Sequence, residues 1–170
     1  MYIYGNFEIN RNKKILKVTK EKIFVKIISP SFDLEYNLDD KKIENRFKKL
    51  VKYSSPDKNI KTLFIWPEGV FSGRSYEEVL NFKSIISKSF SKEHHIIFGS
   101  NKLDLKSGNF YNSMLMVDFN FNIIQRYDKK KLVPFGEFLP FEKFLSNLGL
   151  KKITEGHGSF LKGIMNKNLI

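Results

Sequence analysis

Three short, nearly continuous apolar runs lie in the first hundred residues of the chain, at 23–28, 62–66 and 95–99. Each run is too short for a typical helix and lacks the polar alternation of a half-exposed strand, so each predicts a buried strand. Because 23–28 is rich in β-branched residues and ends at a Ser-Pro pair, we expect it to be a central strand. These runs alternate with helical patterns, which predicts an α/β layered domain.

Two amphipathic helices are expected between the runs. The first extends from Asp39 to about Tyr53, and the second begins at Ser75, which forms a capping box with Glu78. In both helices the apolar residues recur at helical spacing on one face. The residues expected to be buried are Ile43, Phe47, Leu50 and Val51 in the first helix, and Val79, Phe82, Ile86 and Phe90 in the second.

The remainder of the chain predicts a β-hairpin and one more helix. Strands at about 111–117 and 123–127 flank a short turn at Asn120, which is the pattern of two paired antiparallel strands. A short helix is expected over 141–148, where Gly149 would end it.

Composition indicates a single domain with a substantial core. The chain has 170 residues, of which 41% are apolar and 17 are Phe. No repeat or long linker divides it, so we interpret 21–170 as one domain and 1–20 as an irregular or edge-strand lead-in. No apolar run approaches the roughly 20 residues that span a bilayer, and the charged first twenty residues lack the apolar segment of a signal peptide.

The net charge of +12 raises the question of a nucleic-acid partner. Only four of the 30 basic residues are arginines, whereas bidentate contacts to bases and phosphates favour arginine. Lysine is also enriched together with Asn, Ile and Phe, as an A+T-rich coding bias would produce. We therefore predict no nucleic-acid partner. Attraction to an anionic membrane surface is an alternative, and a solvated basic surface is favoured over both.

The chain contains no cysteine, which excludes disulfides, thiolate metal sites and a cysteine nucleophile within it. Its histidines, His94, His95 and His157, lack metal-ligand spacing, and we interpret them as ordinary surface or strand-end residues. The stretch 156–158 contains two glycines but lacks the strand before it and the helix after it that a phosphate-binding loop needs. No metal or cofactor is predicted.

Two carboxylates and one lysine are the candidate site residues. Glu68 follows the second apolar run, at the carboxyl end of a strand, where α/β sheets place their ligand chemistry. Lys129 follows the hairpin, and Glu137 comes eight residues later in an apolar turn with two prolines. An ammonium and a carboxylate in one pocket stabilise each other's charged forms. A carboxylate base beside a lysine suits acyl transfer, because the lysine can stabilise the tetrahedral oxyanion.

Three motifs together resemble a known superfamily. They are Trp66-Pro67-Glu68, Tyr111-Asn112-Ser113, and the stretch 127–140 with the sequence Tyr-Asp-Lys-x-x-Leu-Val-Pro-Phe-Gly-Glu-x-x-Pro. The set resembles the nitrilase (carbon–nitrogen hydrolase) superfamily, and its Val-Pro-Phe-Gly-Glu loop is similar to that of bacterial apolipoprotein N-acyltransferases. The resemblance extends from about residue 23 to about residue 163. It implies a nitrilase-like αββα sandwich, of which the chain would hold an incomplete, N-terminal part.

The resemblance also implies a Glu–Lys–Cys triad. Glu68 would be the general base, Lys129 the oxyanion-stabilising lysine, and Glu137 the additional glutamate that orients Lys129. In this family a cysteine takes an acyl chain from a phospholipid and passes it to the N-terminal diacylglyceryl-cysteine of an apolipoprotein. The implied partners are therefore a phospholipid donor, an apolipoprotein acceptor and the membrane surface, at the periplasmic face of the bacterial inner membrane.

The chain departs from the family pattern in three respects. It lacks the membrane helices that precede this domain in the family, Tyr36 stands where the family often has Trp, and the chain ends at Ile170 before the strand that should carry the cysteine. We therefore expect a partial domain that is inactive alone. Two alternatives remain. One is a fragment of a soluble nitrilase-type amidase, a group that rarely carries Pro-Phe-Gly-Glu, and the other is a non-catalytic pseudo-enzyme or membrane-surface module.

Overall fold

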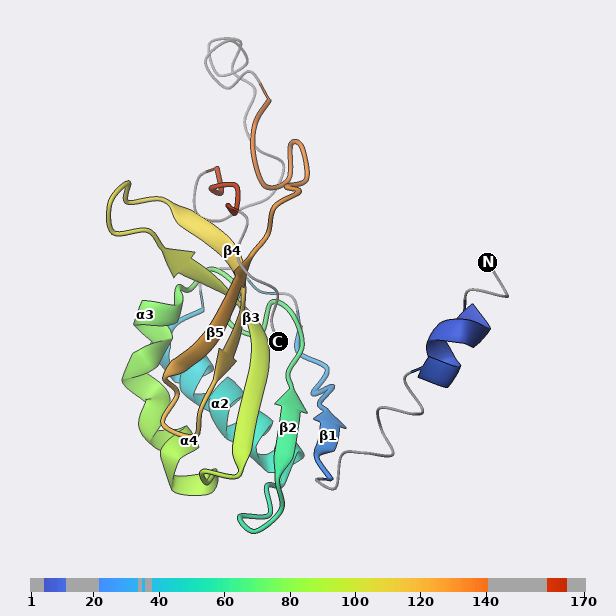
Figure 1. Cartoon of the computed structure of the whole chain (residues 1–170). Coiled ribbons are helices and arrows are strands. Elements are labelled where there is room, and N and C mark those ends of the chain that lie inside the picture. Colours follow the sequence, from blue (N-terminus) through green and yellow to red (C-terminus); the bar gives the residue numbers. More distant parts are fainter. Residues whose placement is uncertain (1–4, 12–21, 34, 36–37, 141–158, 165–170) are drawn as a thin grey trace.

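A five-stranded sheet with helices on one face is the centre of the structure (Figure 1). The structure is a computed structural model that describes residues 5–11, 22–33, 35, 38–140 and 159–164. Its elements in chain order are β1 (Phe24–Ile27), α2 (Asp40–Ser54), β2 (Thr62–Ile65), α3 (Tyr76–Val79), the 3-10 turn η1 (Leu80–Phe82), α4 (Lys83–Ser89), β3 (His94–Leu103), β4 (Phe110–Val117) and β5 (Ile123–Asp128). The predicted α/β class is confirmed.

The strand order places the helices on one side. The strands lie side by side in chain order, with β1, β2 and β3 parallel and β4 and β5 added as an antiparallel hairpin. A crossover between parallel strands is almost always right-handed. Because the sheet grows in one direction from β1 to β3, both crossovers place their helices on the same face, as Figure 1 shows. The described residues thus form one sheet and one helical layer.

The helix-covered face carries an aromatic core. Alternate residues of β2 and β3 are buried against the helices, as the two-residue period of a strand requires. Phe98 is only 1% exposed and stacks on Phe121 with a centroid distance of 5.2 Å. Phe47 of α2 stacks on Phe71 at 4.5 Å. Aromatic pairs of this kind stabilise a core beyond the effect of the area that they bury.

Both predicted helical stretches are confirmed, and the second is interrupted. In α2 the Asp39 side chain accepts from the N–H of Lys42 at 2.7 Å and caps the helix. The capping box between Ser75 and Glu78 is present, but the stretch that follows passes through η1 before α4 begins. The predicted buried positions Ile43, Phe47, Leu50, Val79, Ile86 and Phe90 are buried, and Val51 and Phe82 pack partly buried against the core.

The predicted hairpin is confirmed, with small differences at its ends. β4 and β5 pair from Ser113 opposite Asp128 to Val117 opposite Ile123. In the turn, the Asp118 carboxylate accepts from the backbone N–H groups of Asn120 and Asn122. This arrangement is typical of a short polar turn between antiparallel strands.

Two expectations are wrong. The run 23–28 is not a central strand: β1 pairs with β2 at the edge of the described sheet, and all four of its residues are exposed. Continuous apolarity predicted burial on both faces, but the helical layer does not extend over this edge. Residues 5–11 are helical, where an irregular or edge-strand segment was expected. The helix predicted over 141–148 and the glycine-containing stretch 156–158 lie outside the described residues.

Candidate active site

The Lys129 ammonium pairs with the Glu137 carboxylate at the end of β5. The backbone N–H of Lys129 donates to the carbonyl of Asn112 at 2.8 Å, which keeps Lys129 in register beside β4. From there its Nζ donates to Oε1 of Glu137 at 2.9 Å. The lysine side chain is 37% exposed and the glutamate 14%. The pair therefore lies at a partly enclosed surface, where one charge is accessible and its partner is covered.

Three donors hold the Glu137 carboxylate. Oε1 accepts from Lys129 and from the Asn112 side-chain amide at 2.6 Å, and Oε2 accepts from the Val133 N–H at 2.8 Å. Burial raises the pKa of Glu137, but the Val133 N–H, Lys129 and Asn112 together outweigh it, so the pKa lies below its ordinary value. Glu137 is thus an ionised hydrogen-bond acceptor with both oxygens engaged, which suits an orienting role better than that of a free base.

The loop that carries Glu137 is closed on itself. The Glu137 N–H donates to the Val133 carbonyl, and the Phe135 N–H donates to the Phe138 carbonyl, both at 2.8 Å. Phe135 has a positive φ of 61°, a conformation that is uncommon for a residue other than glycine. These contacts fold residues 133–138 into a tight turn whose base holds the charged pair.

Glu68 lies over β3 and makes no contact with this group. Glu68 lies two residues after Trp66, which directly follows β2. The backbone N–H of Trp66 still donates to the Ile97 carbonyl of β3. The Glu68 side chain is exposed and lies over Gly99 of β3, where an added Cβ would stand 3.4 Å from its Cγ. In the part of the chain that the structure describes, no ion pair or hydrogen bond engages the Glu68 carboxylate.

All three predicted residues share the sheet face opposite the helices. Alternate residues of β3 from His94 onward are buried against the helices, so Gly99, and with it Glu68, belongs to the other face. The register places Asn112 opposite Asn101, two residues beyond Gly99 and on the same face. Asn112 contacts the Lys129–Glu137 pair. Glu68, over β3, and the pair, at the Asn112 end of β4, therefore lie on the same face of the sheet.

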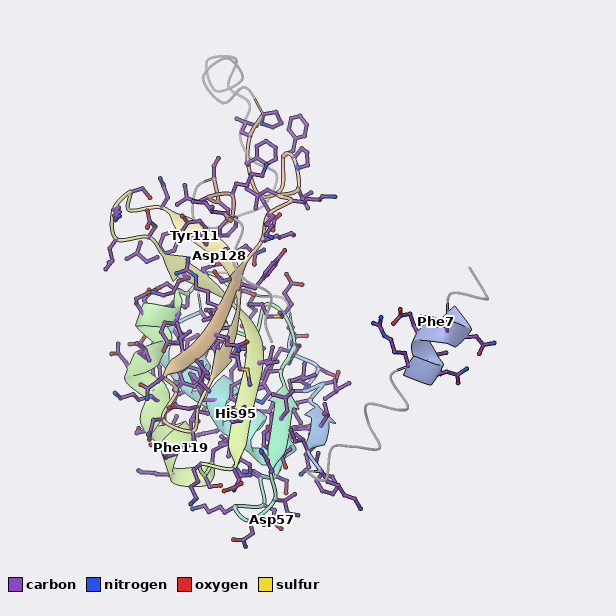
Figure 2. The ribbon with its side chains drawn as sticks, in the orientation of Figure 1. Phe7, Asp57, His95, Tyr111, Phe119 and Asp128 are labelled. Atoms are coloured by element: carbon purple, nitrogen blue, oxygen red, sulfur yellow. The ribbon has the colours of Figure 1, made fainter. Side chains whose placement is uncertain are left out.

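The site lies at the edge of the sheet where β4 begins and β5 ends. Figure 2 shows Tyr111 and Asp128 close together there, with Asp57 at the opposite end of the sheet. This is the edge formed by the carboxyl ends of the parallel strands, as the sequence predicted for Glu68. The structure brings Lys129 and Glu137 together and sets Glu68 on the same face, but no contact joins Glu68 to either. That all three act in one pocket stays a prediction.

Two residues of the site, Asn112 and Gly99, were assigned no role from the sequence. Asn112 anchors Glu137, and Gly99 provides the space that Glu68 occupies. Each leaves a weak signal. Asn112 is an amide in a strand of largely apolar residues, and a glycine inside a strand often marks a close approach by another segment.

His94 and His95 are the histidines that the structure describes. His94 begins β3 as expected of a strand-end residue, but it is fully buried rather than exposed. Its Nδ1 accepts from the Ser91 N–H at 3.0 Å, and its Nε2 donates to the Asp57 carbonyl at 2.8 Å. Among the described residues, no group of three or more His, Asp and Glu could hold a metal ion. Within the same residues, no helix is both long and apolar enough to cross a membrane.

Comparison with known proteins gives consistent sequence relatives. The chain is 34% identical over 113 residues to the apolipoprotein N-acyltransferase of Bradyrhizobium diazoefficiens, which covers 64% of this chain and 21% of that protein. It is 29% identical over 170 residues to the protein of the same name from Rhizobium rhizogenes, which covers 94% and 31%. A shorter match, 48% identical over 54 residues, is to that of Brucella suis, covering 32% and 10%. No family model matches the chain.

Solved structures give a weaker likeness. An N-terminal amidase with an Asn-Glu-Ala peptide is similar at a TM-score of 0.41 and 20% identity, over 64% of this chain and 28% of that one. Saccharomyces cerevisiae Nit3, a member of branch 10 of the nitrilase superfamily, is similar at a TM-score of 0.42 and 16% identity, over 64% and 44%. Scores below 0.5 do not establish a shared fold, and the conclusions below rest on the sequence relatives.

The fold and the site define an α/β domain with charged residues at the carboxyl edge of its sheet. The sequence matches are more specific: the chain is similar to proteins named apolipoprotein N-acyltransferase, the family that its motifs resemble. It spans about a fifth of the length of the first of these relatives and about a third of the second.

Proposed function

We propose that this chain forms the Glu–Lys part of the acyl-transfer site of an apolipoprotein N-acyltransferase. The observation that supports this most directly is the Lys129 ammonium, held at 2.9 Å by a Glu137 carboxylate that Asn112 and the Val133 N–H also fix. The name shared by the sequence relatives supports transfer of an acyl group to a nitrogen of an apolipoprotein. The chain covers only part of those relatives, so the reaction and both substrates are part of the proposal.

Each residue has a distinct task in this proposal. Acyl transfer passes through a tetrahedral intermediate with a negative oxygen, and a cation fixed in advance stabilises that charge without reorganising. Lys129 supplies this cation, and Glu137 keeps it in place. Glu68, whose carboxylate has no partner among the described residues, accepts the proton of the nucleophile. Glu137 cannot easily do this, because both of its oxygens already accept hydrogen bonds.

The acyl group moves in two steps. A thiol sulfur bonds to the carbonyl carbon of a phospholipid ester, its proton passes to Glu68, and the ester C–O bond breaks. The proton then goes to the departing alcohol, leaving a thioester. The α-amine of the apolipoprotein next bonds to the thioester carbon and the C–S bond breaks. The proton that the amine loses passes through Glu68 to the sulfur, which leaves an amide and the free thiol. These 170 residues contain no cysteine, so the thiol must come from outside them.

The surface around the pair is compatible with a lipid substrate. Val133 and Phe135, in the loop that holds Glu137, are exposed apolar residues, and the exposed Lys131 lies just before them. Exposed apolar side chains beside lysines favour an interface with anionic lipid. This surface supports a phospholipid as the acyl donor; the periplasmic face of the bacterial inner membrane, which the family resemblance implies, is part of the proposal.

The test is whether an acyl-enzyme forms. The chain alone, incubated with phospholipid vesicles and analysed by intact mass spectrometry, should gain no acyl mass. A fusion to the remaining, cysteine-containing part of a curated relative should gain one acyl chain. In that fusion, Lys129→Ala should slow acylation by about 10²- to 10³-fold, whereas Lys92→Ala, which removes an exposed lysine just before β3 at the other end of the sheet, should not.

Three outcomes would count against the proposal. A stable acyl adduct on the cysteine-free chain would overturn the assigned chemistry. A fusion that hydrolyses small amides but is not acylated by phospholipid would favour the amidase alternative. A fusion that is folded but inactive toward both would favour a non-catalytic module.

A further inference from the structure

Residues 159–164 lie against the base of the loop that carries the charged pair. Three backbone N–H groups of this segment donate to the site region. Phe160 donates to the Glu137 carbonyl at 2.8 Å, and Gly163 donates to the Lys129 carbonyl at 3.0 Å. Between them, Leu161 donates to the Phe110 carbonyl at 2.8 Å. The segment therefore binds the main chain of both members of the pair.

Beyond the end of β5, this segment takes over as the hydrogen-bonding neighbour of β4. The Asn112 carbonyl accepts from Lys129, the last N–H that the β5 side supplies, and two residues earlier the Phe110 carbonyl accepts from Leu161. A parallel bridge between Tyr111 and Leu161 confirms this alignment. The sheet edge thus continues past the point where β5 turns away, so the loop between Lys129 and Glu137 is closed at its base by a neighbouring chain segment.

Gly163 is required for this close approach. A Cβ on Gly163 would lie 2.7 Å from the carbonyl carbon of Asp128 and 2.9 Å from its Cβ, too close for any side chain. Asp128 cannot move aside easily, because its nearly buried carboxylate accepts from the Ser113 hydroxyl and from Arg126 Nε, both at 2.6 Å. Any larger residue at 163 must therefore push the segment away from the end of β5.

We propose that residues 160–163 are a positioning segment of the site, which fixes the separation of Lys129 and Glu137 through their carbonyl groups, with Gly163 as its indispensable residue. The segment acts through the pair, and none of its atoms is assigned to the reaction. A role in positioning rests on the proposed function, because it presupposes a site to position. The geometric claim, that displacing the segment loosens the pair, is independent of that function.

The variant Gly163→Ala in the full chain tests this claim. The readout is the titration of the Glu137 side-chain carboxyl, followed by NMR with a ¹³C label. The pKa of Glu137 should rise toward its ordinary value, because a displaced loop weakens the contacts with Val133, Lys129 and Asn112 that lower it. Two controls should leave the titration unchanged: Gly5→Ala, where a Cβ meets nothing within 4 Å, and Ile164→Ala, which changes an exposed neighbour.

A second measurement needs no variant and covers the case in which Gly163→Ala fails to fold. In native-state hydrogen exchange of the unmodified chain, the N–H groups of Phe160, Gly163 and Val133 should open together, with protection within about tenfold of one another. Rapid exchange of Phe160 and Gly163 beside a protected Val133 would overturn the proposal. So would a folded Gly163→Ala protein with an unchanged Glu137 titration. Neither result depends on acyl transfer, which the mass assay above tests separately.

Discussion

The two faces of the sheet are built from the same strands but differ in character. On the helix-covered face, the aromatic side chains of β2 and β3 are almost fully enclosed, and Phe64 and Phe98 are at most 1% exposed. On the other face, Ile97 is only partly buried and Ile27 of the edge strand is 77% exposed. That second face carries the charged site. Because successive side chains point to opposite faces of a sheet, one residue of a strand can pack in the core while the next faces the charged site.

The difference between the two faces shows where the fold gains its stability and where its polar contacts are concentrated. Burial of apolar area and close packing on the helix-covered face supply the stabilising free energy. The other face is held together by polar contacts, such as the three hydrogen bonds that Glu137 accepts. The effect of a substitution should therefore depend on the face to which the residue points more than on its place in the chain.

The largest expected effect comes from adjacent residues of β3 on opposite faces. Phe98→Ala should lower the free energy of unfolding by about 3–5 kcal/mol, because it leaves a cavity among enclosed aromatic rings. Ile97→Ala should cost about 1–2 kcal/mol, because its side chain is already partly exposed. Chemical denaturation of both variants measures the difference. An equal loss at Ile97 would mean that the second face is as tightly covered in solution as the first, and the comparison would fail.

An intermediate effect on stability is expected at alkaline pH, from the buried Tyr76 of the helix-covered core. Burial first, and then Glu77 and Asp118, raise the pKa of Tyr76 to about 12, and its hydroxyl donates to the Phe121 carbonyl in the core at 2.6 Å. In the unfolded chain the group ionises near pH 10. The neutral phenol therefore stabilises the fold below pH 10, and up to about 2–3 kcal/mol is lost as pH rises from 10 to 12.

The variant Tyr76→Phe isolates this contribution. It should be less stable than the parent by about 1 kcal/mol at neutral pH, since it loses one buried hydrogen bond. Above pH 10 the order should reverse, because the variant has no phenol to ionise. Thermal unfolding at several pH values would show the crossing. Parallel curves for the two proteins would indicate that Tyr76 is not enclosed as described.

The smallest expected effect is on the face that carries the charged site, where the contribution of Glu137 to stability should decrease in acid. The pKa of Glu137 lies below its ordinary value of 4.5 in the folded protein. Its charge therefore stabilises the fold above the unfolded pKa, and this is lost as pH falls through the folded value. Glu137→Gln should cost about 1 kcal/mol at pH 7 and much less in acid. Glu44→Gln, which breaks an exposed pair with Lys48, should cost only about 0.3 kcal/mol. A pH-independent loss at Glu137 would assign the effect to packing.

Local patterns predicted much of the fold. Helix α2, the capping box at Ser75 and the hairpin each follow from signals within about fifteen residues of chain, where spacing alone decides which side chains meet. The position of β1 did not follow. An apolar run indicates that a strand prefers burial, but its place in the sheet depends on which distant segments pair with it. Likewise, the polar end of β3, from Ser100 to Leu103, is a strand only because β4 pairs with it.

The site divides in the same way. The contact between Lys129 and Glu137 spans eight residues of one loop, so the sequence alone made it a reasonable expectation. The anchoring by Asn112 spans 25 residues and depends on the register of β4, and the space over Gly99 depends on how the chain leaves β2. The segment at 160–163 binds through its backbone, and only Gly163 leaves a trace in the sequence. The catalytic roles of Glu68, Lys129 and Glu137 remain predictions.

The Glu137 carboxylate is both the counter-ion of Lys129 and the latch of its own loop. One oxygen meets the ammonium and the other meets the Val133 N–H that closes the turn. The ion pair therefore restrains the loop from swinging outward, together with the backbone hydrogen bonds within the loop and from Phe160. By reciprocity, any anion that replaces Glu137 at Lys129 favours the open loop to the same extent that opening favours the anion. In this chain, the position of residues 133–138 and the availability of one positive charge are therefore coupled.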